Sequence, residues 1–392
     1  MLKLLIYLFV KLIQMLLDIL WIVFLLALGV QLFYILIIFG RISFFYRSKI
    51  SSGQSNQEGV TVIVAAHNEK ENLKKLIPIL CEQNYPNYDV MIINDRSNDG
   101  TKGLLEEMMS KYPKLRTVTI QYTPDHVTAK KYALTLGIKV AKNDVLLLTD
   151  ADCLPQSDKW ISRMTAPIRV DKKTFALGFS QYSQGKGILN SWIQFETLWT
   201  GLQYISFALW KSPFMGVGRN LSYRKSFFME KKAFKGLWHI ECGDDDLFVN
   251  QYASGNNTAV VVDPESITIS TPKTTWSAYF TQKKRHFHAG KYYKSSDKQK
   301  IGLYSFSHLL FWTIGISLLV ILGIEQKWEH FAIILGIIIV RSILLTSVFT
   351  SARKKLEGKS NMFWTGFFDL MYIGYFWIVG AFGYQSKKVR WK

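Results

Sequence analysis

The chain has 392 residues and a formal net charge of +19, because 48 lysines and arginines outnumber 29 acidic residues. Hydrophobic residues nevertheless make up 49% of the chain. This combination excludes a disordered chain, which joins high charge to low hydrophobicity. Because the apolar residues gather at both ends, it also excludes a purely soluble globule. The cysteines, Cys81, Cys153 and Cys242, are odd in number and far apart, which argues against a disulfide framework and for a reducing compartment.

The first apolar segment covers residues 12–39 and is interrupted only by Gln14, Asp18 and Gln31. It is long enough for a membrane-spanning helix, which needs about 20 apolar residues. It lacks a small-residue cleavage site, so we expect a permanent anchor within residues 1–46. Three basic residues follow at once: Arg41, Arg47 and Lys49. By the positive-inside rule they place the next domain in the cytoplasm.

The middle region, residues 55–300, alternates short apolar runs with helical patterns. The runs that predict strands cover residues 60–66, 90–94, 115–120 and 145–149. The helical patterns between them cover residues 69–83, 103–111 and 129–140. Strands that alternate with helices predict an α/β fold with a mostly parallel sheet and helices on both faces. Ligands bind beyond the carboxyl ends of the strands in such sheets.

Polar clusters follow three of these predicted strands. They contain His67 and Glu69 after the first strand, Asp95 after the second, and Asp150 and Asp152 after the fourth. Turn chemistry explains any one of them, since Asn, Asp, Ser and Gly are common in loops. Three clusters at strand ends of one sheet predict a ligand site. Two carboxylates two residues apart suit Mg²⁺ or Mn²⁺, with the phosphates of a ligand completing the shell.

Two further clusters come later in the chain. Asp244, Asp245 and Asp246 are adjacent, and such crowding raises a carboxylate pKa and suits a general base. The alternative is a helix N-terminus, which acidic residues stabilise. The basic run QKKRH at 282–286 lies in an aromatic-rich segment, 276–300, that we expect at the membrane interface. It meets either anionic lipid or, through an arginine, a diphosphate.

The C-terminal region, residues 301–392, holds three more apolar blocks, at 304–324, 331–349 and 363–384. The linker between the last two is basic and therefore expected in the cytoplasm. A third span would put the basic tail outside, against the same rule. We therefore expect two or three transmembrane helices, the alternative for the last block being a re-entrant or interfacial segment. Arg341 and Asp369 lie inside these blocks and either pair with each other or serve a function.

These motifs, in this order, resemble the membrane-bound inverting glycosyltransferases of family 2, which include cellulose, chitin and hyaluronan synthases and ceramide glucosyltransferase. The segment VTVIVAAHNEKENLKKLIPILCEQNYPNYDVMIINDRSNDGT at 60–101 looks like the family's N-terminal signature almost throughout. The resemblance covers roughly residues 60–290. It implies a GT-A-type nucleotide-sugar-binding domain with a metal at an Asp-x-Asp motif.

The resemblance also assigns roles to individual residues. For the nucleoside-diphosphate sugar donor it implies four binding residues: Glu69, Asp95, Lys130 and Asp150. Asp150 and Asp152 match the metal motif for Mg²⁺ or Mn²⁺. Asp244 matches the catalytic base, and Asn220 matches a segment beneath the acceptor site. Gln282 and Arg285 match the Gln-x-x-Arg-Trp motif, which binds the donor diphosphate or the acceptor.

Two residues depart from the family pattern. His286 replaces the tryptophan of the last motif, which affects stacking on the acceptor side. Gly243 replaces the usual acidic residue before the base, so the register of the base among Asp244, Asp245 and Asp246 stays open.

The expected function is transfer of a sugar from a nucleoside-diphosphate sugar to a lipid or glycolipid acceptor. The protein would be a multi-pass protein of the cell membrane with a cytoplasmic catalytic domain, in contact with membrane lipids. No nucleic-acid-binding motif accompanies the basic charge, so nucleic acid is not an expected partner. One alternative is a processive polysaccharide synthase, and a second is a membrane-anchored nucleotide-sugar binder without catalysis.

Overall fold

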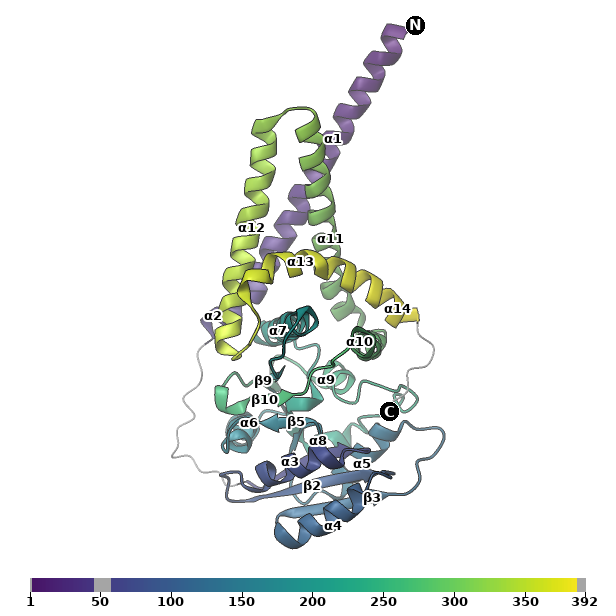
Figure 1. Cartoon of the computed structure of the whole chain (residues 1–392), viewed down its shortest axis with the longest axis vertical. Helices are drawn as coiled ribbons and strands as arrows, with labels where there is room; N and C mark the ends of the chain where they lie inside the picture. The colour runs from purple at the N-terminus through teal and green to yellow at the C-terminus, as the bar shows by residue number, and fades with distance from the viewer. Residues whose placement is uncertain (1, 46–57, 386–392) are drawn as a thin grey trace.

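The computed structural model describes residues 2–45 and 58–385, and it places an α/β domain beneath a bundle of long helices (Figure 1). Arg47, Lys49 and the basic tail from residue 386 onward, which entered the orientation argument above, lie outside the described residues.

The central sheet has seven strands in the order β3-β2-β1-β4-β8-β6-β9. The strands are β1 (Val60–Ala66), β2 (Tyr88–Asp95), β3 (Leu115–Ile120), β4 (Val145–Leu148), β6 (Phe175–Leu177), β8 (Leu221–Arg224) and β9 (Thr258–Val260). The first four are parallel, and β8 pairs antiparallel with both β4 and β6. Every residue of β1 and β2 is buried, as expected for parallel strands covered on both faces. The predicted mostly parallel α/β fold is confirmed.

Helices cover both faces of this sheet. They are α3 (Lys70–Cys81), α4 (Thr101–Lys111), α5 (Ala129–Val140) and α6 (Trp160–Arg169). Val62 and Val64 of β1 point to a core shared with α3, α4 and α6, whereas Ile63 and Ala65 point to a core shared with α5. This alternation follows from the two-residue repeat of a strand. The predicted strands and helices of residues 60–149 lie within two residues of their observed ends.

The second half of the domain is built from shorter elements. A three-stranded sheet has the order β5-β10-β7. Its strands are β5 (Cys153–Pro155), β7 (Ser180–Tyr182) and β10 (Thr268–Ser270). The helices and helical turns are α7 (Ile188–Leu209), η2 (Gly218–Asn220), α8 (Lys225–Glu230), α9 (Asp246–Tyr252), η3 (Pro264–Ser266) and α10 (Trp276–Gly290). Both α7 and α10 lie between the sheets and the long helices (Figure 1).

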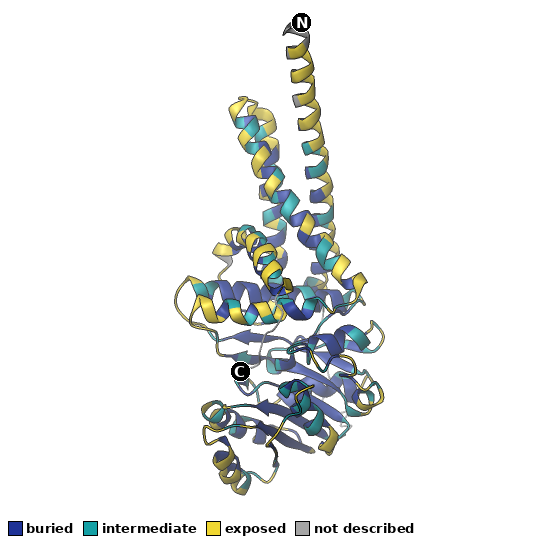
Figure 2. Cartoon of the chain, turned by 90° about the vertical axis from the view of Figure 1, so that its right-hand side faces the viewer, coloured by how far each residue is buried: buried dark blue, intermediate teal, exposed yellow. Residues whose placement is uncertain are grey.

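Three long helical segments form the bundle above the domain. They are α1 (Leu2–Leu32), continued by η1 (Phe33–Phe39) and α2 (Arg41–Phe44), then α11 (Ser295–Ile324) and α12 (Trp328–Lys355). Each is long and apolar enough to cross a membrane. Inside the bundle the rings of Phe24 and Phe311 stack with their centroids 5.2 Å apart. Leu26 and Ile343 are among its exposed large apolar residues. Figure 2 shows that exposed positions recur along the helices of the bundle.

The last apolar block lies across the base of the bundle rather than alongside α11 and α12 (Figure 1). It comprises η4 (Met362–Trp364), α13 (Thr365–Gly374), η5 (Tyr375–Val379) and α14 (Gly380–Gln385). There α13 packs on α7, and α14 packs on α10. A side chain at Gly383 would place its Cβ 2.6 Å from Phe287 Cβ, so glycine permits the close approach of α14 to α10.

A buried polar cluster joins this crossing segment to the bundle. Arg341 of α12 forms an ion pair with Asp369 of α13, which confirms the pairing that was one of the two interpretations of these charges. His308 Nε2 lies 3.1 Å from the second oxygen of Asp369, and Trp312 Nε1 donates to Asp369 at 3.1 Å. Arg341 also donates to Gln31 of α1. The cluster therefore ties four helices together.

Candidate active site

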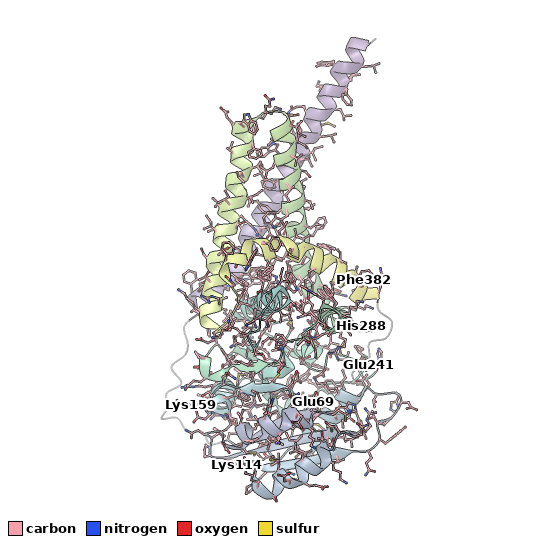
Figure 3. The ribbon with its side chains drawn as sticks, viewed as in Figure 1. Glu69, Lys114, Lys159, Glu241, His288 and Phe382 are labelled. Atoms are coloured by element: carbon pink, nitrogen blue, oxygen red, sulfur yellow. The ribbon has the colours of Figure 1, made fainter. Side chains whose placement is uncertain are left out.

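A cavity of about 1230 Å³ opens beyond the carboxyl ends of β1 and β4. Its lower wall carries the acidic residues at the strand ends, with Glu69 beside the sheet and Glu241 to one side (Figure 3). Its upper wall is formed by α7, α10, η5 and α14. The cavity thus reaches from the sheet to the segment at the base of the helix bundle.

Asp150 and Asp152 form the part of this wall that could hold a cation. They follow β4 directly, and their carboxylates and the Cys153 thiol offer ligand atoms within 4.8 Å of one another. Burial raises the pKa of the Cys153 thiol well above its ordinary value, and a thiol is a less suitable ligand than a carboxylate for Mg²⁺ or Mn²⁺. The two carboxylates are only partly buried and can accept a further partner. This oxygen donor set fits Mg²⁺ or Mn²⁺.

Lys130, on the first turn of α5, bridges two of the acidic clusters. Its Nζ lies 3.2 Å from Asp150 Oδ1 and 3.0 Å from Asp244 Oδ2. Burial alone would lower the pKa of this ammonium group, but the carboxylates of Asp150 and Asp244 raise it well above the ordinary value. Lys130 is therefore a permanent positive charge between the strand end and the aspartate loop.

Gly243 allows the backbone conformation of the loop that carries the three aspartates. Its φ is +82°, and a Cβ there would lie 2.4 Å from Leu247 Cδ1. An acidic side chain would clash at this position. The backbone therefore explains why glycine stands where the family pattern has an acid.

The three adjacent aspartates have different environments. Asp245 caps α9, accepting from the backbone N–H groups of Gly218 and Asp246. Burial and the charge of Asp244 raise the pKa of Asp245 to about 6. Asp246 accepts from Tyr293 Oη at 2.7 Å, and burial and Asp245 raise its pKa to about 8.

Asp244 behaves in the opposite way to its two neighbours. Burial favours a higher pKa, but Lys130 and Lys131 hold the pKa of Asp244 below its ordinary value. Crowding therefore raises the pKa of Asp245 and Asp246 as expected, but the expectation is wrong for Asp244, because two lysines surround it. The helix-capping alternative also holds, for Asp245.

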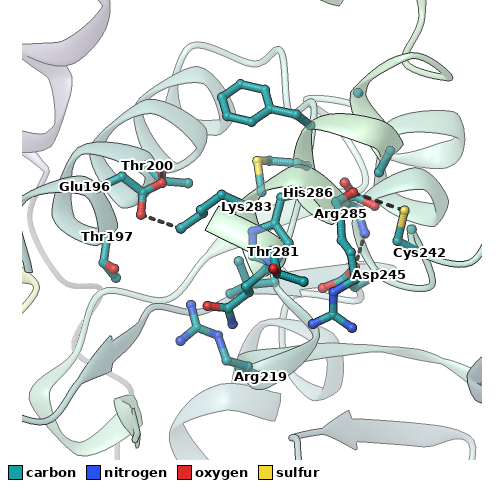
Figure 4. Close-up of a pocket in the computed structure, with 18 of the residues that line it drawn as sticks. Glu196, Thr197, Thr200, Arg219, Cys242, Asp245, Thr281, Lys283, Arg285 and His286 are labelled. Carbon is teal, nitrogen blue, oxygen red and sulfur yellow. Dashed lines mark hydrogen bonds and ion pairs between the residues drawn. The ribbon is translucent and has the colours of Figure 1, made fainter. Parts of the chain in front are cut away.

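The residues of α10 enter the cavity from above (Figure 4). Gln282 Nε2 donates to Tyr182 Oη at 3.2 Å. Arg285 has no carboxylate within ion-pair distance among the described residues, and its side chain faces the cavity. Burial and the charges of Lys283 and Arg285 lower the pKa of His286 well below 6.5, so its imidazole is neutral at pH 7.

Of the residues expected to bind the donor, Glu69 lies on the cavity wall and Asp95 does not. Glu69 accepts from Asn72, and burial is the main cause of its raised pKa. Asp95 is fully buried, and both of its carboxylate oxygens accept from Arg96, at 2.8 and 3.1 Å. Its contact with a nucleoside would require Arg96 to move.

Comparison with known proteins agrees with this arrangement. Residues 61–231 match the model of the family described as glycosyl transferase family 2. The chain carries a family 2 glycosyltransferase domain.

Curated proteins that are similar in sequence to this chain are named glycosyltransferases or glycolipid synthases. The chain is 25% identical over 243 residues to a probable glycosyltransferase, YdaM, of Bacillus subtilis, covering 59% of this chain and 55% of the relative. It is 34% identical over 101 residues to the beta-monoglucosyldiacylglycerol synthase of Trichormus variabilis, covering 25% and 21%. The matched parts therefore span about half the length of the first relative and a fifth of the second.

A solved structure shares the fold. A mannosyltransferase of Pyrobaculum calidifontis, solved with GDP-mannose and Mn²⁺, superposes with a TM-score of 0.52. The alignment covers 86% of this chain and 99% of that one, at 13% identity. The domain that contains residues 61–231 thus has a GT-A-type fold, as expected.

The structure also brings Glu196 and Thr200 into the cavity, which the sequence analysis did not single out. Lys283 forms a buried ion pair with Glu196 of α7, and Thr200 Oγ1 donates to the same carboxylate at 3.2 Å. Arg219, beside the predicted Asn220, also lines the cavity. Glu196 and Lys283 are 87 residues apart, so no local motif could pair them. Arg219 did have a local signal, since it is the charged residue of the segment GVGRN at 216–220.

Proposed function

We propose that this protein is an inverting, metal-dependent glycosyltransferase. It moves a sugar from a nucleoside-diphosphate sugar to a hydroxyl of a lipid or glycolipid acceptor at the cytoplasmic face of the cell membrane. The observation that carries the proposal is the continuity of the cavity, from Asp150 and Asp152 to η5 and α14 at the base of the helix bundle. Its volume exceeds the roughly 300–1,000 Å³ of a typical small-molecule site, which leaves room for two substrates.

At the donor end, Glu69, Lys130 and Asp150 line the space where the nucleotide sugar would bind. Asp150 and Asp152 would hold Mg²⁺ or Mn²⁺, which supplies Lewis-acid neutralisation of the donor diphosphate. Lys130 fixes the orientation of Asp150 and adds a positive charge beside the leaving group. Asp95, the last residue of β2, would contact the nucleoside once Arg96 no longer occupies the Asp95 carboxylate.

Asp244 is the proposed catalytic base. It is the aspartate of the three whose pKa is held down, so it is ionised at neutral pH and able to take a proton. Asp246 is protonated at pH 7, and the Asp245 carboxylate is occupied by two backbone N–H groups. Asp244 would remove the proton of the acceptor hydroxyl as that oxygen attacks the anomeric carbon from the side opposite the diphosphate, which inverts the configuration.

Gln282 and Arg285 would act on the leaving group or the acceptor from above. The guanidinium group of Arg285 has the geometry to bind two phosphate oxygens at once. Gln282 is held by Tyr182, so its amide is oriented before a substrate arrives.

The membrane arrangement we propose has three spans, α1, α11 and α12, with residues 363–385 at the interface. Because α11 and α12 cross the membrane in opposite directions, this arrangement leaves the catalytic domain and the basic linker at 351–361 on the same side, the cytoplasm. It removes the conflict between the positive-inside rule and the basic tail. In this division residues 1–46 form the anchor, 55–300 the catalytic domain with its interfacial segment 276–300, and 301–392 the C-terminal membrane region.

Transfer of a single sugar suits this bundle better than processive synthesis. A polymer would have to be threaded across the membrane, but the interior of the bundle is filled by side chains that include Phe24, Phe311 and Leu318. A single transfer to a lipid requires no channel.

The assignment of the base is tested with Asp244→Asn in the detergent-solubilised chain. The variant should lose about 10²–10⁴-fold in kcat, the usual contribution of general base catalysis, while donor binding stays within about twofold. The matched control is Asp171→Asn, which neutralises an exposed aspartate that does not line the cavity. This variant should keep full activity. Turnover of Asp244→Asn at the control rate would refute the assignment.

The metal site is tested with Asp152→Ala. Activity should fall together with the stimulation by added Mg²⁺ or Mn²⁺, and the apparent affinity for Mn²⁺, followed by its paramagnetic resonance, should drop at least tenfold. Full activity of the wild type in excess chelator would contradict the metal role.

A further inference from the structure

Arg219 carries a positive charge on the cavity wall that forms no direct ion pair among the described residues, although Asp150 and Asp152 lie close enough to raise its pKa. Its Nη1 is buried and has no hydrogen-bond partner among the described residues. No carboxylate of the described chain lies within ion-pair distance of its guanidinium group. The closest favourable contact is the ring of Tyr182, whose centroid lies 4.7 Å from Cζ of Arg219. Figure 4 shows Arg219 facing the same cavity as Arg285 and His286.

The backbone of Arg219 is held firmly from several sides. Its carbonyl accepts from Thr149 Oγ1 at 3.0 Å and from Thr268 Oγ1 at 3.1 Å. The next residue, Asn220, donates to the carbonyls of Phe179 and Ser266 at 2.8 and 2.7 Å. Arg219 and Asn220 are therefore hydrogen-bonded to residues of both sheets or next to them. Thr149 directly precedes Asp150 in the sequence. The backbone that carries the guanidinium group is therefore fixed beside the end of β4, where Asp150 and Asp152 follow.

The aromatic partner of Arg219 is positioned as well. Tyr182 Oη accepts from Gln282 of α10, which fixes the ring that the guanidinium group stacks on. A cation over an aromatic ring keeps its N–H edge free to donate. The unpartnered Nη1 belongs to that edge.

Other buried cations of the cavity wall are neutralised. Lys130 pairs with Asp150 and Asp244, and Lys283 pairs with Glu196. A buried charge without a partner is costly, and a ring face offsets only part of that cost. A guanidinium group in this state matches a group that offers two oxygens, such as a phosphate.

We propose that Arg219 is an oxyanion-binding residue of the site, which donates to a phosphate group of a substrate. The substrate class rests on the proposed glycosyl transfer. Two sources share this chemistry: the diphosphate of the donor and a phosphate carried by the acceptor. The direct link from Arg219 through Thr149 to the strand end that bears Asp150 favours the donor diphosphate.

The test compares Arg219→Gln and Arg219→Lys in the full-length protein, with Arg116→Gln as control because the Arg116 side chain is exposed and lies outside the cavity. Equilibrium binding is measured for inorganic pyrophosphate, uridine and guanosine diphosphates, and the nucleosides uridine and guanosine, all with Mg²⁺. If the anion belongs to the donor, Arg219→Gln weakens binding of the diphosphates and pyrophosphate at least tenfold. Arg219→Lys recovers part of that loss, and nucleoside binding stays within about twofold.

If the anion belongs to the acceptor, diphosphate binding is unchanged in Arg219→Gln. The KM for a polyprenyl phosphate acceptor then rises at least tenfold, while transfer to diacylglycerol keeps its kinetics. The inference is overturned if Arg219→Gln matches Arg116→Gln in both measurements. It is also overturned if both Arg219 variants lose diphosphate and nucleoside binding equally with a lower thermal midpoint, since that indicates a structural role.

Failure of this inference is distinguishable from failure of the proposed function. A wild-type protein that transfers sugar while Arg219→Gln keeps its kinetics and pyrophosphate affinity disproves the role of Arg219 alone. A wild-type protein that transfers no sugar, but binds pyrophosphate through Arg219, disproves the proposed function and leaves the oxyanion site in place.

Discussion

At the residue scale, the protonation state and the role of an aspartate depend on its neighbours. Three consecutive aspartates share one loop, yet Lys130 keeps Asp244 ionised, helix capping engages Asp245, and burial and the charge of Asp245 keep Asp246 protonated at neutral pH. The division of roles between proton acceptor, cap and buried acid follows from these contacts.

The pKa of Asp246 predicts a specific dependence of stability on pH. Its folded value of about 8 is raised from an ordinary 3.8, so the folded state holds a proton that the unfolded state releases at lower pH. The stability contributed by this proton is full below about pH 4 and is lost as pH rises through 8. Asp246→Asn should remove this loss, which amounts to at most about 1.4 kcal/mol per pH unit.

The measurement is the thermal midpoint of the solubilised protein between pH 5 and 9. The midpoint of the wild type should fall more steeply with pH than that of Asp246→Asn, and Asp171→Asn should follow the wild type. Equal slopes for wild type and Asp246→Asn would contradict the environment assigned to Asp246.

Sequence patterns predicted much of the site and missed what depends on long-range packing. The strand-end rule placed Asp150 and Asp152 correctly at the sheet edge, and Lys130, Asp244, Gln282 and Arg285 reach the same cavity. The exception is Asp95, which follows its strand as expected but is engaged by Arg96. A sequence pattern cannot show that a neighbouring cation occupies a carboxylate.

At the scale of elements, the helices that were hard to recognise are those buried on nearly all sides. Helix α3 has one buried face, with Leu73, Leu76 and Leu80, and its pattern is plain in the sequence. Helix α7 is buried along almost its whole length, so it lacks the polar face that marks an amphipathic helix. Three-residue strands such as β6 and β9 are too short to show an alternation. They exist because neighbouring strands pair with them.

The cluster around Asp369 is the element-scale feature with the clearest mutational consequence. Asp369→Ala leaves Arg341 buried without its partner, which should destabilise the protein by about 3–5 kcal/mol. The double variant Asp369→Ala/Arg341→Met removes both charges and should recover most of this loss. Thermal unfolding in a mild detergent measures both effects. Losses that add in the double variant would contradict a coupled ion pair.

At the scale of the whole molecule, the charge and the hydrophobicity of the chain occupy different places. Many of the apolar residues lie in three long helices and a segment across their base (Figures 1 and 2). The cavity runs from the sheet to that segment. Positive charges of Lys130, Arg219 and Arg285 face the cavity. Under the proposed function, a phosphorylated donor and a lipid acceptor would meet at this one site, at the membrane surface.

Labelling of introduced cysteines tests the arrangement in the membrane. A membrane-impermeant maleimide applied to intact cells should label Gln326→Cys, in the turn between α11 and α12. It should label Lys359→Cys and Tyr384→Cys only after permeabilisation, because both lie on the side of the catalytic domain. The wild-type chain is the background control, since two of its cysteines are buried. Labelling of Tyr384→Cys on intact cells would show that residues 363–384 cross the membrane.

The central claim, transfer of one sugar to a membrane lipid, is tested most directly by following the sugar itself. The full-length protein is placed in lipid vesicles with Mg²⁺ or Mn²⁺ and offered a panel of radiolabelled nucleotide sugars. The account predicts that one donor yields a lipid-extractable product carrying a single sugar, with one nucleoside diphosphate released per sugar, and that Asp244→Asn forms this product about 10²–10⁴-fold more slowly. Label in a water-soluble polymer, or binding of donors with no release of nucleoside diphosphate, would contradict it.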